Sequence, residues 1–185
     1  MEIIETYISG LYIIEPDVFE DSRGYFFESF NEAKLEAVGI TTRFVQDNQS
    51  KSSYGVIRGL HFQLEPHAQT KLVRVLEGSI YDVAVDVRTG SPNYGKWFGI
   101  ELTAENKKQL YVPKGFAHGF SVLSATAVVF YKCDHLYSPG FEGGIRFDDP
   151  ELGIDWKVDA GKAILSGKDK ELPLLKEAKI DFRFS

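Results

Sequence analysis

Short apolar runs, rich in β-branched and aromatic residues, recur along the whole chain and constrain its fold more than any other feature. They return roughly every 8–12 residues and are separated by turn residues, as in the stretch TGSPNYG at 89–95. The chain holds 14 Phe and 9 Tyr alongside 17 Gly, a mixture typical of twisted strands joined by tight turns. This pattern predicts an all-β protein in which two sheets form a jelly roll.

Helical signals are few. Asn31 is expected to cap a helix that runs through Val38 and stops at Gly39, and a short helix is possible over 174–178. The turn residues at 76–79 stand between two β-branched runs and predict a hairpin there. We therefore expect a jelly-roll sandwich or barrel with a few short peripheral helices.

Length and charge narrow the classes of function. A chain of 185 residues predicts a single domain over 1–185. Its 21 basic and 27 acidic residues give a net charge of -6 without a basic block, so a nucleic acid polymer is not an expected partner. Cys133 is the only cysteine, which excludes an intramolecular disulfide. No signal-like start or long apolar stretch is present, so we expect a cytoplasmic, soluble protein without membrane contact.

The stretch VIRGLHFQLEPHAQTK, residues 56–71, places charged groups within an apolar strand pattern. Such groups are costly to bury unless they are paired, so they suggest a site. Alternation places Lys71 on the same face as Val73 and Val75, which predicts an inward lysine. A regular strand would point Arg58 and His61 to opposite faces, whereas a β-bulge at Gly59 would turn both inward, and we predict that bulge.

The histidine pattern argues against a metal site. The motif P-x-G-x-x-H at 113–118 resembles half of the cupin metal signature, but the other half reads His61-Phe62-Gln63, and glutamine is a poor ligand for a transition metal. Without a metal, His61 becomes a candidate general base. His118 is either a second cavity residue or a histidine that is hydrogen-bonded at a turn.

Other residues admit both a functional and a packing interpretation. Tyr131 shares a strand face with Ala127 and Val129, so it is expected to be buried, either for packing or as an acid opposite a base. Arg23, Arg58 and Lys71 could together bind a small dianion such as a diphosphate. No glycine-rich dinucleotide loop, P-loop, nucleophile elbow or catalytic cysteine context is present, which argues against a nucleotide cofactor and an acyl-enzyme.

Six sequence blocks carry a family resemblance: FEDSRGYFFESF, VQDNQSKSSYGVIRGLHFQ, KLVRVLEGSIYDVAVDVRTGSP, QLYVPKGFAHGF, EGGIRFDDP and LSGKD. In this order they resemble the dTDP-4-dehydrorhamnose 3,5-epimerase family over nearly the whole chain. The resemblance implies a cupin-type jelly roll and a homodimer that needs no metal or cofactor. It also implies an isomerase that inverts C3 and C5 of a dTDP-sugar, dTDP-4-dehydro-6-deoxy-D-glucose, in the synthesis of dTDP-L-rhamnose.

The resemblance also implies roles for single residues. His61 matches the base, Asp169 the carboxylate that pairs with it, Tyr131 the acid on the opposite ring face, and Lys71 the cation near the keto oxygen. Residues expected to bind the nucleotide sugar are Arg23, Glu28, Gln46, Asn48, Arg58, His118, Glu142 and Lys168. Some of these would come from the partner subunit through exchange of N-terminal strands.

One departure from the family pattern concerns the thymine. The segment after Cys133 reads Asp134-His135-Leu136-Tyr137, where many relatives have two adjacent tyrosines. Tyr137 or an N-terminal aromatic residue could stack on the base instead.

Two other functions remain open from the sequence. A close relative could epimerise only C3 or only C5, or could move the ketone of a related dTDP-sugar. A non-catalytic, sugar-binding jelly roll is the alternative from another class, and it would not need an inward base, acid and cation together.

Overall fold

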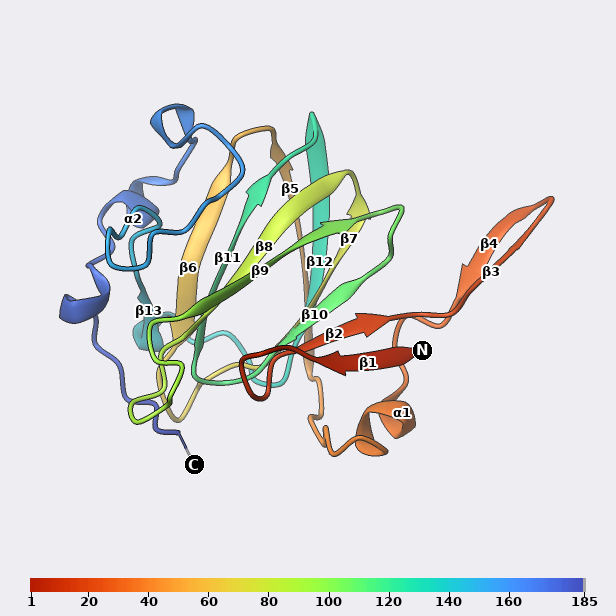
Figure 1. The fold of residues 1–185 in the computed structure, drawn as a ribbon, viewed down its shortest axis with the longest axis horizontal. Coiled ribbons are helices and arrows are strands. Elements are labelled where there is room, and N and C mark those ends of the chain that lie inside the picture. Colours follow the sequence, from red (N-terminus) through yellow and green to blue (C-terminus); the bar gives the residue numbers. More distant parts are fainter. Residues whose placement is uncertain (185) are drawn as a thin grey trace.

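Two antiparallel sheets face each other across an apolar core in the computed structural model, which describes residues 1–184 (Figure 1). Ser185, the end of the predicted 1–185 domain, lies outside the described residues. The first sheet contains, in spatial order, β1 (Glu2–Glu5), β2 (Tyr12–Glu15), β10 (Gln109–Val112), β7 (Lys71–Glu77), β12 (Thr126–Cys133) and β5 (Gln46–Ser53). The second contains β13 (Glu142–Gly144), β6 (Ile57–Gln63), β11 (Phe116–Val122), β8 (Ser79–Asp86) and β9 (Trp97–Thr103). The all-β prediction is confirmed.

Alternating side chains of both sheets build the core between them. Val73 and Val75 of β7 point inward, and they pack in one cluster with Ile80 and Ala84 of β8. Each of these four side chains is 5% exposed or less. Lys71 stands two residues before Val73 on the same face, so the predicted inward direction of the lysine is confirmed by its place in the cavity described below.

A second apolar layer covers the outer face of the second sheet. Val83 and Val85 of β8 pack there against Trp156, Leu175 and Phe182 of the C-terminal segment. This segment lies along β6 and β13 in Figure 1 and carries α2 (Gly167–Lys170) beside them. Burial of this layer therefore fixes α2 next to the strand that holds His61.

Helices are short within residues 1–184: besides α2 they comprise α1 (Glu32–Glu36) and three 3-10 turns at Pro139–Phe141, Ala160–Lys162 and Leu175–Glu177. Asn31 caps α1 as predicted, because its Oδ1 accepts a hydrogen bond of 3.2 Å from the Lys34 backbone. The helix ends at Glu36 rather than Val38. The possible helix over 174–178 is a single 3-10 turn. None of these helices is long and apolar enough to cross a bilayer.

The hairpin predicted at 76–79 is wrong. Strands β7 and β8 belong to different sheets, so the turn carries the chain from one sheet to the other. Gly78 has a φ of +76°, and a Cβ atom there would lie 2.1 Å from the Thr126 carbonyl oxygen. The glycine is required by this close crossing, which a local turn motif cannot distinguish from a hairpin.

The predicted irregularity at Gly59 is confirmed. His61 pairs with His118 and Arg58 pairs with Phe120, so β6 carries one extra residue relative to β11. Gly59 has a φ of +117°, and a Cβ atom there would lie 2.6 Å from the His118 carbonyl oxygen. As a result Arg58 and His61 both line one cavity.

A hairpin of β3 (Val18–Asp21) and β4 (Gly24–Phe27) projects away from the two sheets (Figure 1). Phe19, Tyr25 and Phe26 in this hairpin are 65%, 59% and 70% exposed. Aromatic side chains gathered on so exposed an element are typical of an interaction surface.

Candidate active site

A cavity with two lobes opens between the sheets, and His61, Lys71 and Tyr131 line both lobes. The first lobe, of about 300 Å³, is also lined by Gln46, Asn48, Phe62, Gln63, Gln69, Tyr137 and Glu142. The second, of about 200 Å³, is also lined by Ser50, Arg58, His118, Phe120, Ser166, Lys168 and Asp169. Of the site residues predicted from the sequence, all but Arg23 and Glu28 lie on these walls.

His61 and Asp169 form a hydrogen-bonded pair. Nε2 of His61 lies 2.5 Å from Oδ1 of Asp169, which is 4% exposed. Burial raises the pKa of Asp169, but the hydrogen bond and charge of His61 outweigh it, so the pKa falls below its usual value. Asp169 is therefore ionised near neutral pH, and the Nε2 hydrogen of His61 is donated to it. Only Nδ1 of His61 is left to accept a proton.

The capping residue Ser166 fixes the position of Asp169. Its Oγ accepts a hydrogen bond of 3.1 Å from the Asp169 backbone at the start of α2. The packed C-terminal segment thus positions the Asp169 carboxylate beside His61, although the two residues are distant in the sequence.

Lys71 and Tyr131 come from the sheet opposite His61. They lie on the adjacent strands β7 and β12, and the Lys71 amine is 6.0 Å from the centroid of the Tyr131 ring. Burial lowers the pKa of Lys71, while Cys133, Asp82 and Glu142 act in the opposite direction. Burial raises the pKa of Tyr131, so its phenol keeps its proton near neutral pH. The cavity thus places a basic nitrogen and a phenol on opposing walls.

His118 is a cavity residue rather than a turn histidine. It lies on β11 directly opposite His61 in register, and its Nε2 lies 2.8 Å from Oδ1 of the buried Asp82. Asp82 was not predicted as a site residue. The signal was available, since alternation places this carboxylate on the same strand face as Ile80 and Ala84.

Glu142 and Lys168 close one side of the cavity. The Lys168 amine and the Tyr137 hydroxyl both donate to Oε2 of Glu142, the latter at 2.8 Å. Burial raises the pKa of Glu142, but these donors and the Lys168 charge bring it below its usual value. Gln46 accepts a hydrogen bond of 3.0 Å from the Tyr137 backbone, which ties the tyrosine to the first lobe.

Two amide side chains on the first lobe, those of Gln63 and Gln69, were not singled out from the sequence. Gln63 donates to the His67 carbonyl at 2.7 Å and accepts from the Ser138 backbone at 2.7 Å. Gln69 donates to the His135 carbonyl at 2.7 Å. These bonds hold the loop that presents Tyr137 to the cavity.

Arg23 and Glu28 lie away from the cavity. Arg23 is at the tip of the projecting hairpin, where its guanidinium pairs with Asp21 at 2.5 Å. Glu28 pairs with Lys34 at 2.9 Å near the start of α1. Within one chain these two residues are not brought together with His61.

The fold and the cavity together define a class: a jelly roll in which one cavity between the sheets holds a histidine paired with a carboxylate, a protonated phenol and an amine. Such a set can remove a proton on one side of a bound molecule and return one on the other.

Comparison with known proteins identifies the family. The family model described as dTDP-4-dehydrorhamnose 3,5-epimerase matches residues 5–177. The dTDP-4-dehydrorhamnose 3,5-epimerase of Shigella flexneri is 54% identical over 170 residues, which are 91% of this chain and 93% of that protein. The chain therefore belongs to the dTDP-4-dehydrorhamnose 3,5-epimerase family, and the expected assignment as an isomerase is confirmed.

Solved structures agree with this assignment and with the cupin-like jelly roll. The dTDP-4-dehydrorhamnose 3,5-epimerase of Elizabethkingia anophelis NUHP1 superposes with a TM-score of 0.92 at 56% identity, covering 96% of this chain and 97% of that one. A dTDP-6-deoxy-D-glucose-3,5-epimerase of Legionella pneumophila, solved in complex with dTDP-4-keto-L-rhamnose, gives a TM-score of 0.93 at 50% identity. The match covers 100% of this chain and 98% of the Legionella chain.

Proposed function

We propose that this protein inverts C3 and C5 of dTDP-4-dehydro-6-deoxy-D-glucose to give dTDP-4-dehydro-L-rhamnose, as a step toward dTDP-L-rhamnose. The observation that carries the proposal is the placement of His61 and Tyr131 on opposite sheets of one cavity, with Lys71 lining the same space. Family membership and the ligand named for the Legionella structure support the choice of substrate.

The first step is removal of the hydrogen on C3 or C5. The C4 ketone acidifies both positions, because the electron pair left on carbon is delocalised onto the carbonyl oxygen. Nδ1 of His61 accepts the proton, and Asp169 stabilises the resulting imidazolium through Nε2. General base catalysis contributes roughly 10²–10⁴-fold, so the enolate needs further stabilisation.

Lys71 supplies that stabilisation. Lys71 lines both lobes together with the base and the phenol, so its amine can bind the C4 oxyanion as it forms. Tyr131 then donates its phenolic proton to the same carbon from the opposite face, which inverts the centre. One proton leaves and one returns at each carbon, so no redox cofactor or metal is required in this scheme.

The two lobes divide the rest of the substrate. Gln46, Asn48 and the exposed ring of Tyr137 line the first lobe, and Tyr137 would stack on the thymine in place of the missing second tyrosine. Arg58, His118 and Lys168 in the second lobe would bind oxygens of the nucleotide sugar. Leu136, 61% exposed, does not line either lobe.

The homodimer is part of the proposal. The β3–β4 hairpin carries exposed aromatic residues, and Arg23 at its tip is remote from the cavity of its own chain. We infer that the hairpin docks on a second copy, so that Arg23 and Glu28 complete the partner's site. The cytoplasmic location and the single domain expected from the sequence remain predictions.

Mixing two inactive variants tests the exchange. In a heterodimer of Arg23→Ala and His61→Asn chains, one cavity has both His61 and the partner's Arg23 intact only if Arg23 acts between subunits. Because one of its two cavities is then intact, each heterodimer should have about half of the activity of a wild-type dimer. No recovery in verified heterodimers would place Arg23 in its own chain's site or outside any site.

Proton NMR of the reaction in deuterated water tests the proposed function. The wild-type protein should exchange deuterium into C3 and C5 of dTDP-4-dehydro-6-deoxy-D-glucose and yield the doubly inverted product. Inversion at a single carbon would instead identify a C3-only or C5-only epimerase. Absence of exchange in this and related ketosugars would refute the catalytic function and support a sugar-binding protein.

A further inference from the structure

Strand β8 carries two aspartates on the face that packs into the core between the sheets. Asp82 and Asp86 alternate with Ile80 and Ala84, and all four side chains are 0% exposed. A buried carboxylate is costly unless charge and hydrogen bonds compensate it. Each aspartate therefore needs partners that explain its position.

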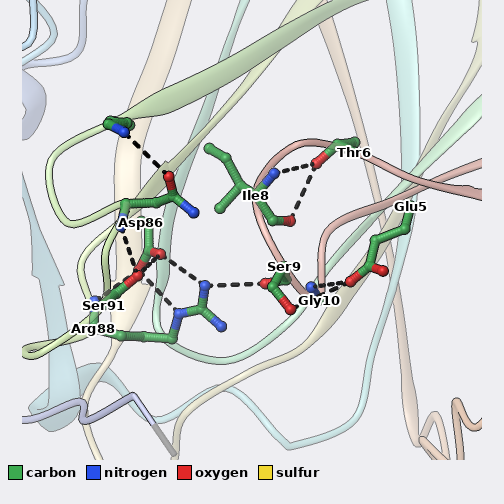
Figure 2. A network of polar contacts seen from close by, with 10 residues as sticks. Glu5, Thr6, Ile8, Ser9, Gly10, Asp86, Arg88 and Ser91 are labelled. Carbon is green, nitrogen blue, oxygen red and sulfur yellow. Dashed lines mark hydrogen bonds and ion pairs between the residues drawn. The ribbon is translucent and has the colours of Figure 1, made fainter.

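The partners of Asp86 explain it fully as a structural residue. Its Oδ1 accepts from Arg88 Nε at 2.9 Å, and its Oδ2 accepts from Arg88 at 2.7 Å and from Ser91 at 2.6 Å. Arg88 also donates to the Ser9 carbonyl at 3.0 Å (Figure 2). This network joins β8 to the N-terminal segment and lies outside both lobes of the cavity.

Asp82 has far fewer partners. Its Oδ1 lies 2.8 Å from Nε2 of His118, whereas Oδ2 is buried without a hydrogen-bond partner in residues 1–184. The charge of Asp82 also acts on Lys71, where it raises the pKa of the amine against the effect of burial. A group that is buried this completely cannot contact a substrate, so any role in turnover must act through His118 and Lys71.

We propose that Asp82 is a positioning residue of the active site, which holds the His118 ring with Nε2 protonated and Nδ1 toward the cavity and supplies one of the negative charges that act on Lys71. Its role in turnover rests on the function proposed above, whereas its effect on the His118 ring does not.

The chemistry follows from what a carboxylate can do. An ionised carboxylate only accepts hydrogen bonds, so Nε2 of His118 carries hydrogen and only Nδ1 remains for the substrate. His61 is held in the same way by Asp169, and the two histidines are register partners on β6 and β11. One cavity wall thus presents two neighbouring imidazoles, and in each of them Nδ1 is the nitrogen left to interact with the substrate.

Other charged groups also surround His118, and they must be kept constant in any test. The titratable residues that share the second lobe with it are Arg58 and His61 from β6, Lys71 from β7, Tyr131 from β12, and Lys168 and Asp169 from α2. Asp82 is the one whose carboxylate bonds to the ring.

Kinetics of Asp82→Asn, with Asp86→Asn as the matched control, test the role in turnover. The isosteric Asp82→Asn should lower kcat by about 10–100-fold with a smaller change in KM, as loss of an orienting group does. Its alkaline loss of activity should move to lower pH, because Lys71 loses a neighbouring anion. Asp86→Asn should lower stability but leave kcat and the pH profile of the folded protein unchanged. Equal pH profiles and kcat for Asp82→Asn and wild type would overturn the role.

NMR of the histidine ring nitrogens tests the geometry without substrate. In ¹⁵N-labelled wild-type protein the His118 ring, assigned with a His118→Gln variant, should be protonated at Nε2. Protonation at Nδ1 alone would overturn the proposal even if Asp82→Asn failed to fold. If the wild type does not turn over the ketosugar, the proposed function fails, and this measurement still decides whether Asp82 holds His118.

Discussion

Nε2 of His61 lies 2.5 Å from Oδ1 of Asp169, although the two residues are 108 positions apart in the chain. The bond commits Nε2 to the carboxylate and leaves Nδ1 as the basic atom. Because α2 is held against β6 by the C-terminal apolar layer, the orientation of the base depends on packing outside the cavity.

His61→Asn should abolish deuterium exchange into C3 and C5, because asparagine cannot accept the proton. Asp169→Asn should lower kcat by about 10²-fold or more, since it removes the charge that stabilises the imidazolium. Both are measured by NMR in deuterated water. His67→Asn, which changes a histidine that packs on His135 and Phe141 outside the lobes, is the control and should exchange normally. Exchange at the wild-type rate in His61→Asn would remove His61 as the base.

Tyr131→Phe should separate exchange from inversion. The base and the amine remain, so deuterium exchange should persist, whereas delivery of a proton to the opposite face should fall by roughly 10²-fold or more. Product stereochemistry by NMR measures the second quantity. Tyr111→Phe is a control that removes a partly desolvated hydroxyl bonded to Thr42, away from the cavity. The acid role would be contradicted by equal inversion rates in Tyr131→Phe and wild type.

Lys71→Met should lower kcat by about 10²–10³-fold, the effect of removing one preorganised group at a developing oxyanion. In the wild type, burial lowers the pKa of Lys71, so its charge is present at lower pH and is lost as pH rises toward the usual value of 10.5. Activity should therefore fall on the alkaline side before that value. A pH series of kcat measures this, and Lys51→Met, which changes an exposed lysine on β5, should leave the profile unchanged. If the activity of Lys71→Met fell at alkaline pH in the same way as that of the wild type, the alkaline loss of activity would belong to another group.

Several parts of the fold could be predicted because they depend on local pattern. Alternation placed Lys71 with Val73 and Val75, and the need to turn Arg58 and His61 to one side predicted the irregularity at Gly59. The turn at Gly78 failed because a tight turn looks the same whether the flanking strands pair with each other or enter separate sheets. Which strands pair is decided by contacts across the core.

The site residues could be predicted only where a sequence motif or strand pattern marks them. No spacing rule connects His61 with Asp169, so their pairing was implied only by the family resemblance. Asp82 could have been found from alternation on β8, where a carboxylate interrupts an apolar face. The resemblance also assigned Arg23 and Glu28 to the substrate, but their own chain places them away from it, and a single sequence does not reveal which subunit uses them.

Arg88→Met should destabilise the protein by about 3–5 kcal/mol, because it leaves the buried Asp86 carboxylate without its counter-charge. Burial raises the pKa of Asp86, but the hydrogen bonds from Arg88 and Ser91 bring it below its usual value of 3.8. A carboxyl with a lowered pKa in the folded state contributes stability that is present above 3.8 and is lost as pH falls through the lowered folded value. Urea unfolding at pH 7 and at successive values below 4 measures both effects.

The double variant Arg88→Met/Asp86→Asn sharpens this prediction. Removing the carboxylate charge together with its partner should cost less than the sum of the two single changes, because no uncompensated charge then remains in the core. The Arg88 guanidinium carbon lies 4.5 and 4.9 Å from the ring centroids of Phe116 and Phe184. Both variants that carry Arg88→Met lose these contacts, so the contacts cancel in the comparison. Additive effects would mean that Arg88 stabilises the protein through those contacts and through Ser9 rather than through the charge of Asp86.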